Sequence, residues 1–235
     1  MLLINQLKIR NHKPEITNIK LKTLKMKYII LTTLLLALSL SMFAQNEKYV
    51  QRMKENIDLL YNAKTPAEYN TVAASFERIA DAEKNQWLPY YYASLAHVWR
   101  GFADAAADKD ELAAQATKLI DKAEALDKNA ETAIVKNMIA TIQMLVDPQS
   151  RFMSYGMEAN KALGVAKQLD PNNPRIYYLE GQSTFGTPPQ FGGGKDKAKP
   201  LLEKSVQLFE SHKPASELHP VWGKSAAISA LAKCN

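Results

Sequence analysis

Apolar residues that recur every three or four positions restrict the fold of this chain more than any other feature of its sequence. From residue 45 onward this spacing continues through about nine segments, and no alternating run of strand length interrupts it. Short connections rich in Asp, Asn, Gly and Pro separate the segments, as expected between antiparallel helices. The sequence therefore predicts an all-α chain, with helices at about 49–63, 65–83, 88–104, 109–126, 130–146, 150–169, 174–185, 195–211 and 217–233.

Local signals support these boundaries. Thr65 followed by Pro66 and, three residues after the Thr, by Glu68 forms a capping box, which predicts a helix start. Asp170-Pro171 ends the segment before it, because Pro cannot continue a helix.

An ordered alternation of small and large residues recurs along the chain. Ala159, Leu163, Ala166 and Leu169 are spaced by four, three and three residues. The small residues allow close approach of a neighbouring helix, and the large ones fill the groove between helices. The same spacing is found in two further sets: Ala116, Ile120, Ala123 and Leu126, and Ala198, Leu202, Ser205 and Leu208. The sequence thus predicts repeated helix pairs.

This repeat, followed by Tyr177 and Gly181 four residues apart, resembles the tetratricopeptide repeat, although its copies lie further apart than that family's 34-residue period. The resemblance implies a solenoid of antiparallel helix pairs over 45–235. The segment around the glycines 192–194 is similar to variants in exported bacterial repeat proteins, including those that accompany tripartite solute transporters. The structural repeat positions would be Ala116, Ile120, Ala123, Ala159, Leu163, Ala166, Pro171, Tyr177, Gly181, Gly192, Gly193, Ala198 and Leu202.

The resemblance also implies a concave binding face, which the first helix of each pair would line. The expected binding residues are Tyr91, Arg175, Tyr178, Gln182 and Phe185. An aromatic cluster between residues 87 and 102 fits two interpretations, core packing or a partly exposed groove. It consists of Trp87, Tyr90, Tyr91, Tyr92, Trp99 and Phe102.

The N-terminal part differs from the rest. Residues 26–44 combine a basic flank, a short apolar run and a small residue at Ala44, which predicts a secretory signal peptide cleaved after that residue. The alternative is an uncleaved membrane anchor, for which the run is at the short limit. The run ending in Phe43-Ala44-Gln45 resembles signal peptides of Bacteroidetes-type bacteria, so the periplasm is the expected location. Residues 1–25 are unusual as a leader, and Met26 is a candidate start.

The positive charge of the chain belongs to this N-terminal part alone. Residues 1–44 hold seven of the 30 Lys and Arg residues and one of the 24 Asp and Glu residues, which leaves 23 of each for the remainder. A neutral body argues against a nucleic-acid partner.

The glycines 192–194 raise the possibility of a phosphate loop. A Walker loop requires a Gly five residues before the Gly-Lys pair and a Ser or Thr after it, but Pro189 and Asp196 occupy these positions around Lys195. We expect a turn between two helices, with Asp196 capping the second and Phe191 packed against the pair.

The sequence gives no pattern for catalysis or metal binding. His97, His212 and His219 match no ligand spacing, so His212 and His219 are expected to be solvated loop residues. Cys234 is the single cysteine, next to the C-terminus, and predicts an inert frayed thiol or, alternatively, an intermolecular disulfide.

Together these features predict an exported, non-enzymatic repeat scaffold, without cofactor or metal, that binds a protein or peptide partner and meets a membrane only if the signal segment stays uncleaved. The alternative is a small-molecule-binding accessory of a transport system. A deep enclosed apolar pocket would favour the alternative, and an open groove would favour the scaffold.

Overall fold

A computed structural model describes Met26 and residues 47–235. The expected signal peptide over 26–44 and the leader over 1–25 therefore lie outside the described residues, Met26 excepted. Residues Val50–Asn235 form one compact unit, to which the following description refers. None of the described helices is long and apolar enough to cross a membrane.

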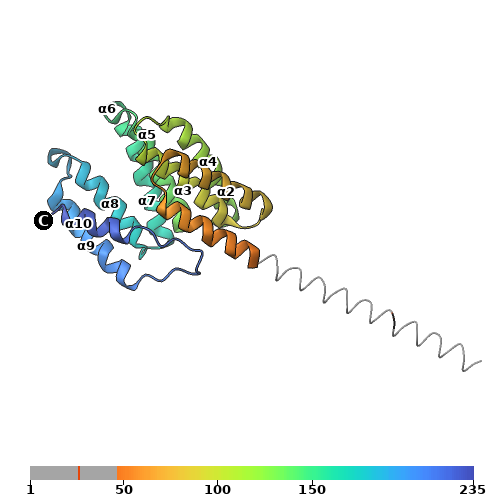
Figure 1. The fold of residues 1–235 in the computed structure, drawn as a ribbon. Coiled ribbons are helices and arrows are strands. Elements are labelled where there is room, and N and C mark those ends of the chain that lie inside the picture. The colour runs from red at the N-terminus through yellow and green to blue at the C-terminus, as the bar shows by residue number, and fades with distance from the viewer. Residues whose placement is uncertain (1–25, 27–46) are drawn as a thin grey trace, which may run out of the picture. The chain divides into compact units, whose positions relative to one another are not determined.

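Every regular element among the described residues is helical, which confirms the all-α prediction (Figure 1). The first helix occupies 47–62 of the described chain. The elements after it are α2 (Pro66–Ala82), α3 (Trp87–Ala103), α4 (Lys109–Leu126), α5 (Ala130–Met144), α6 (Pro148–Arg151), a π-helical turn (Phe152–Gly156), α7 (Met157–Leu169), α8 (Pro174–Gly186), a 3-10 turn (Pro189–Phe191), α9 (Lys195–Ser211) and α10 (Lys224–Ala232).

Side-chain caps begin several of these helices. The capping box predicted at the start of α2 is present, with reciprocal bonds between Thr65 and Glu68. Asp108, Asn129 and Asn173 accept from backbone N–H groups at the starts of α4, α5 and α8. These caps explain why the predicted boundaries agree with the observed ones there.

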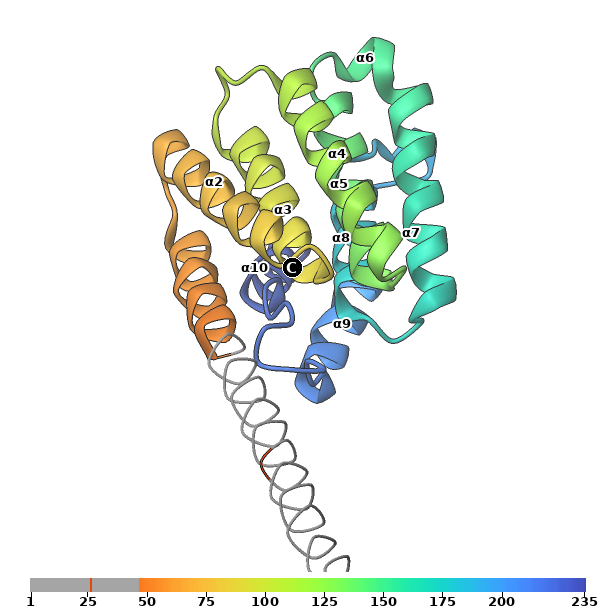
Figure 2. The same ribbon diagram turned by 90° about the vertical axis from the view of Figure 1, so that its right-hand side faces the viewer.

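Helices that follow one another in the chain pack against one another (Figure 2). Pairs in contact include α2 with α3, α3 with α4, α5 with α7, and α8 with α9. Most of the repeat positions are buried, and Pro171 and Gly192 are exposed. Gly181 has the role that its position predicts, because a Cβ there would lie 2.6 Å from Cδ2 of Leu202 on α9.

The glycine turn between α8 and α9 differs from expectation in its details. Gly192 and Gly194 adopt positive φ, and the N–H of Gly194 donates to the carbonyl of Thr184 at 2.9 Å. Asp196 does not cap α9, since Gly194 is the N-cap and no side chain bonds there. Phe191 does not pack into the turn, because 74% of it is exposed.

The C-terminal part differs from expectation in two further respects. The expected helix over 217–233 begins only at Lys224, since Pro220 and Gly223, at φ 110°, separate it from the preceding residues. Residues 212–223, here called the C-terminal segment, instead form no helix of their own. Cys234 is not frayed but buried in a core cluster with Leu202 and Phe209.

Candidate functional site

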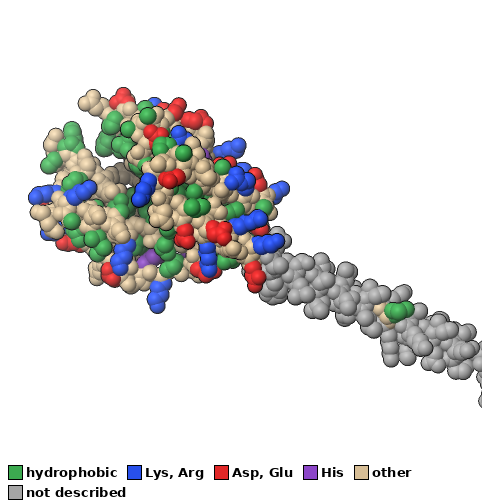
Figure 3. All heavy atoms as spheres, in the orientation of Figure 1, with side chains coloured by type: hydrophobic (Ala, Val, Ile, Leu, Met, Phe, Trp, Pro, Cys, Tyr) green, Lys and Arg blue, Asp and Glu red, His purple; other side chains and the backbone are tan. Residues whose placement is uncertain are grey.

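A groove of about 1200 Å³ opens on the surface of the unit Val50–Asn235. Residues of α3, α5, the π-helical turn, α7, α8, the glycine turn, the C-terminal segment and α10 line it. Figure 3 shows hydrophobic side chains on both sides of this hollow. This volume exceeds the range of about 300–1000 Å³ that is usual for small-molecule sites, so the groove has room for a large ligand.

Aromatic side chains form much of the groove. The rings of Trp99 on α3 and Trp222 on the C-terminal segment meet edge to face, with centroids 6.1 Å apart and planes at 88°. Tyr178 on α8 also lines the groove, and burial raises the pKa of its phenol. The aromatic lining residues are Trp99, Phe102, Phe152, Tyr178, Phe191 and Trp222.

The rim of the groove carries exposed apolar surface. Phe152 in the π-helical turn is 47% exposed, and Phe191 in the 3-10 turn is 74% exposed. Both residues line the groove, and they belong to segments almost forty residues apart in the sequence. Exposed apolar surface around a hollow is typical of a site that a ligand covers.

The chemistry of the groove lining is mainly apolar and neutral. Lys224 is its one charged residue, and its ammonium lies 3.1 Å from Glu210 in an exposed ion pair. Met138 and Met144 contribute thioethers, and the lining contains no His and no Cys. No group of three or more His, Cys, Asp or Glu side chains suited to a metal ion occurs among the described residues.

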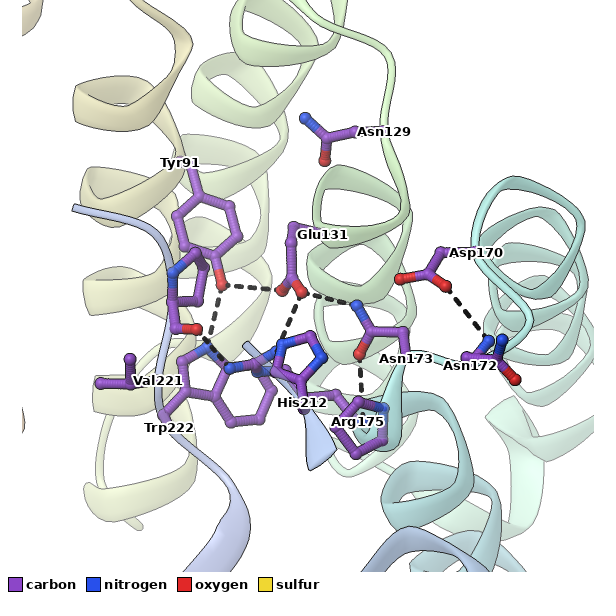
Figure 4. Close-up of polar contacts among 12 residues, drawn as sticks. Tyr91, Asn129, Glu131, Asp170, Asn172, Asn173, Arg175, His212, Val221 and Trp222 are labelled. Atoms are coloured by element: carbon purple, nitrogen blue, oxygen red, sulfur yellow. Dashed lines mark hydrogen bonds and ion pairs between the residues drawn. The ribbon is translucent and has the colours of Figure 1, made fainter. Parts of the chain in front are cut away.

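A buried polar network lies next to the groove (Figure 4). Arg175 at the start of α8 is fully buried, and its Nη1 lies 3.0 Å from Oε1 of Glu131 on α5. The same Oε1 accepts from Nδ2 of Asn173 at 2.7 Å. The other guanidinium nitrogen, Nη2, donates to the carbonyl of Pro220. The network therefore ties α5, α8 and the C-terminal segment together.

Tyr91 and Trp222 extend this network to the groove. The hydroxyl of Tyr91 on α3 donates to Oε2 of Glu131 at 3.4 Å and accepts from Nε1 of Trp222 at 2.9 Å (Figure 4). The guanidinium of Arg175 also lies over the Trp222 ring, 5.1 Å from its centroid. Burial raises the pKa of Tyr91, and the carboxylate of Glu131 acts in the same direction, so the phenol stays protonated.

The five expected binding residues are thus found in different places. Tyr178 and Gln182 line the groove. Arg175 and Tyr91 are fully buried instead of facing a ligand, because both pair with Glu131 inside the fold. The sequence pattern does not reveal this pairing. Phe185 is 41% exposed and is not part of the groove lining.

The aromatic cluster of α3 serves both of its proposed roles. Tyr90, Tyr91 and Tyr92 are core residues, whereas Trp99 and Phe102 line the groove. Trp222 and Phe152 were not anticipated as site residues. Their only sequence signal is a bulky aromatic within the first two turns of a predicted helix, which many core residues share.

The histidines lie outside the groove. His97 is buried and its Nε2 lies 3.4 Å from Glu77. His212 and His219 are partly buried in a second hollow of about 350 Å³, not solvated as expected. Burial lowers the pKa of all three, and the nearby guanidinium of Arg175 further lowers the pKa of His212.

A comparison with solved structures finds a close match. The chain is similar to the HusA haemophore from Porphyromonas gingivalis, with a TM-score of 0.73 and 37% sequence identity. The match covers 79% of this chain and 92% of that one. No protein-family model and no curated protein sequence matches. The two chains share a fold over nearly the whole length of the haemophore.

Proposed function

This chain belongs to the family of the HusA haemophore, and we propose that it is an exported binding protein, without catalytic activity, that holds haem in the groove. The observation that carries the proposal is a groove of about 1200 Å³ with aromatic walls and an apolar rim. This favours a small molecule over an extended peptide. The assignment of the helix pairs to the tetratricopeptide type is also part of this proposal.

The groove suits a flat macrocycle. The aromatic rings of Trp99, Trp222 and Tyr178 offer faces and edges for stacking on an apolar ring system. Phe152 and Phe191 cover the part of the ligand that would otherwise face water. Lys224 supplies a cation for a carboxylate of the ligand, because its exposed ion pair with Glu210 is weak enough to exchange.

Ring contacts, more than iron coordination, supply the affinity in this proposal. Haem iron in proteins is held by His, Cys, Met or Tyr. The lining offers Met138, Met144 and Tyr178 but no imidazole or thiol. Iron-free protoporphyrin IX is therefore expected to bind in the same groove as haemin.

Export is proposed from the N-terminal segment over 26–44, with cleavage after Ala44 and release into the periplasm. Intact mass measurement of the secreted protein tests this, since cleavage predicts a chain that starts at Gln45. A secreted chain that retains Met26 would contradict it.

Absorbance titration with haemin tests the ligand. We expect a saturable shift of the Soret band with the wild-type protein. Phe152→Ala and Phe191→Ala each remove a rim ring and should weaken binding about three- to tenfold, the usual contribution of one aromatic contact.

Phe185→Ala is the matched control, because Phe185 is similarly exposed but lies outside the groove lining. Its affinity for haemin should equal that of the wild type. Absence of a saturable Soret shift would reject haem as the ligand. A loss in Phe185→Ala as large as in the rim variants would reject the groove as the place where haem binds.

A further inference from the structure

We propose that the buried network of Glu131, Arg175 and Tyr91 is a positioning device for Trp222, and that it thereby sets the shape of the groove wall. The inference rests on the proposed function where it concerns ligand affinity. The position of Trp222 itself is independent of any ligand. None of the three network residues lines the groove, so each acts through Trp222.

The C-terminal segment does not hold Trp222 in place by its own backbone structure. Residues 212–223 form no helix, and Trp222 stands directly before Gly223, which has a φ of 110°. A side chain on a segment of this kind needs fixed partners outside the segment.

The network provides such partners on two sides of the indole. At its edge, Nε1 of Trp222 donates to the hydroxyl of Tyr91 at 2.9 Å. At its face, the guanidinium of Arg175 lies 5.1 Å from the ring centroid. Because the two contacts act in different directions, they fix the tilt of the ring as well as its place.

Glu131 holds both of these partners. Its Oε2 accepts from Tyr91 at 3.4 Å, and its Oε1 accepts from Arg175 at 3.0 Å. The carboxylate thus orients a hydroxyl on α3 and a guanidinium on α8 at once. Replacing a buried ion pair by apolar residues often leaves stability unchanged or raises it, which makes stability alone a weak explanation for this arrangement.

Two hydrogen bonds also anchor the backbone of the C-terminal segment. Nη2 of Arg175 donates to the carbonyl of Pro220, and the N–H of Val221 donates to the hydroxyl of Tyr61 at 3.3 Å. These bonds hold the two residues immediately before Trp222. Its ring is thereby presented edge to face to Trp99 in the groove.

The test removes one hydroxyl from the network. Tyr91→Phe keeps the ring and the Glu131–Arg175 pair but deprives the Trp222 indole N–H of its acceptor. The indole ¹H–¹⁵N resonance of Trp222 should move upfield, with the resonances of Trp87 and Trp99 shifting less. Haemin affinity should fall about threefold to tenfold, the usual effect of losing one buried hydrogen bond.

Tyr90→Phe is the matched control. Tyr90 is a buried neighbour on α3 whose hydroxyl donates to the carbonyl of Ala80, away from the groove. This variant should leave the Trp222 resonance and haemin affinity unchanged. If Tyr91→Phe leaves the Trp222 resonance in place, or if Tyr90→Phe moves it equally, the positioning role is wrong.

The two proposals fail in distinguishable ways. A wild-type protein that does not bind haemin would reject the proposed function, while the indole resonance would still decide the positioning of Trp222. Haemin binding that is equally strong in both Tyr variants would reject the inferred link between the network and the groove.

Discussion

Two single residues, both glycines, allow neighbouring segments to pack closely against the backbone. Gly181 lets α8 approach Leu202 on α9. Gly193 fits against the end of α8, where a Cβ would lie 2.1 Å from the carbonyl oxygen of Thr187 and 2.6 Å from that of Thr184. Backbone atoms cannot give way as a flexible side chain can. The glycine turn is therefore a structural connection between α8 and α9. The sequence predicts this role, because its spacing does not match a phosphate loop.

Gly193→Ala should lower the free energy of unfolding by about 1–3 kcal/mol, because the added methyl group meets two carbonyl oxygens. Urea unfolding measures this change. Gly164→Ala on α7 is the control, since nothing lies within 4 Å of its Cβ position, and it should stabilise by about 0.5–1 kcal/mol. Lys195→Ala, at an exposed position, should change little. Equal stability of Gly193→Ala and wild type would contradict this structural role of the glycine turn.

At the scale of elements, the helices could be predicted from sequence wherever a cap and an apolar period agree. The start of α2 at Thr65 and the start of α8 at Asn173 are examples. The prediction was wrong over 217–223, where apolar spacing suggested a helix. There the buried Arg175 binds the carbonyl of Pro220, and this tertiary contact holds the segment in a non-helical path.

The C-terminal segment should make stability depend on pH through His212. Burial and the guanidinium of Arg175 lower the pKa of His212 below its ordinary 6.5, although Glu131 and Asp170 oppose this. The unfolded chain then binds a proton that the folded chain resists. The stabilising contribution is therefore present above pH 6.5 and is lost as pH falls from 6.5 toward the folded-state pKa.

Urea unfolding at pH 7.5 and 5.5 measures this effect. His212→Gln should lose less stability between the two pH values than the wild type does. His97 and His219 also have lowered pKa values, but they are present in both proteins and drop out of the comparison. An equal loss in both proteins would show that His212 does not contribute.

At the scale of the molecule, the groove could be anticipated only in part. Tyr178 and Gln182 were predicted because they share the face of one helix. Phe152 and Trp222 were missed, since the groove joins them from segments seventy residues apart in sequence. The resemblance to the tetratricopeptide repeat predicts Arg175 on the concave binding face, but Arg175 is fully buried. Only the fold reveals that Glu131 pairs with it.

Because the groove joins several elements, a ligand bound in it should stabilise the whole folded unit. The groove draws on α3, α5, α8, α10 and the C-terminal segment, so it exists only while all of them are folded together. A ligand that binds only the folded chain at about 100 times its dissociation constant adds about 2.7 kcal/mol to stability. Haemin at that concentration should therefore raise the urea midpoint, and hydrogen exchange should slow in α3 and α10 alike. Phe191→Ala should leave the ligand-free midpoint unchanged, because this ring is exposed, yet gain less from haemin. Protection confined to one of the two helices would contradict a ligand that joins them, since a single folded groove must protect both.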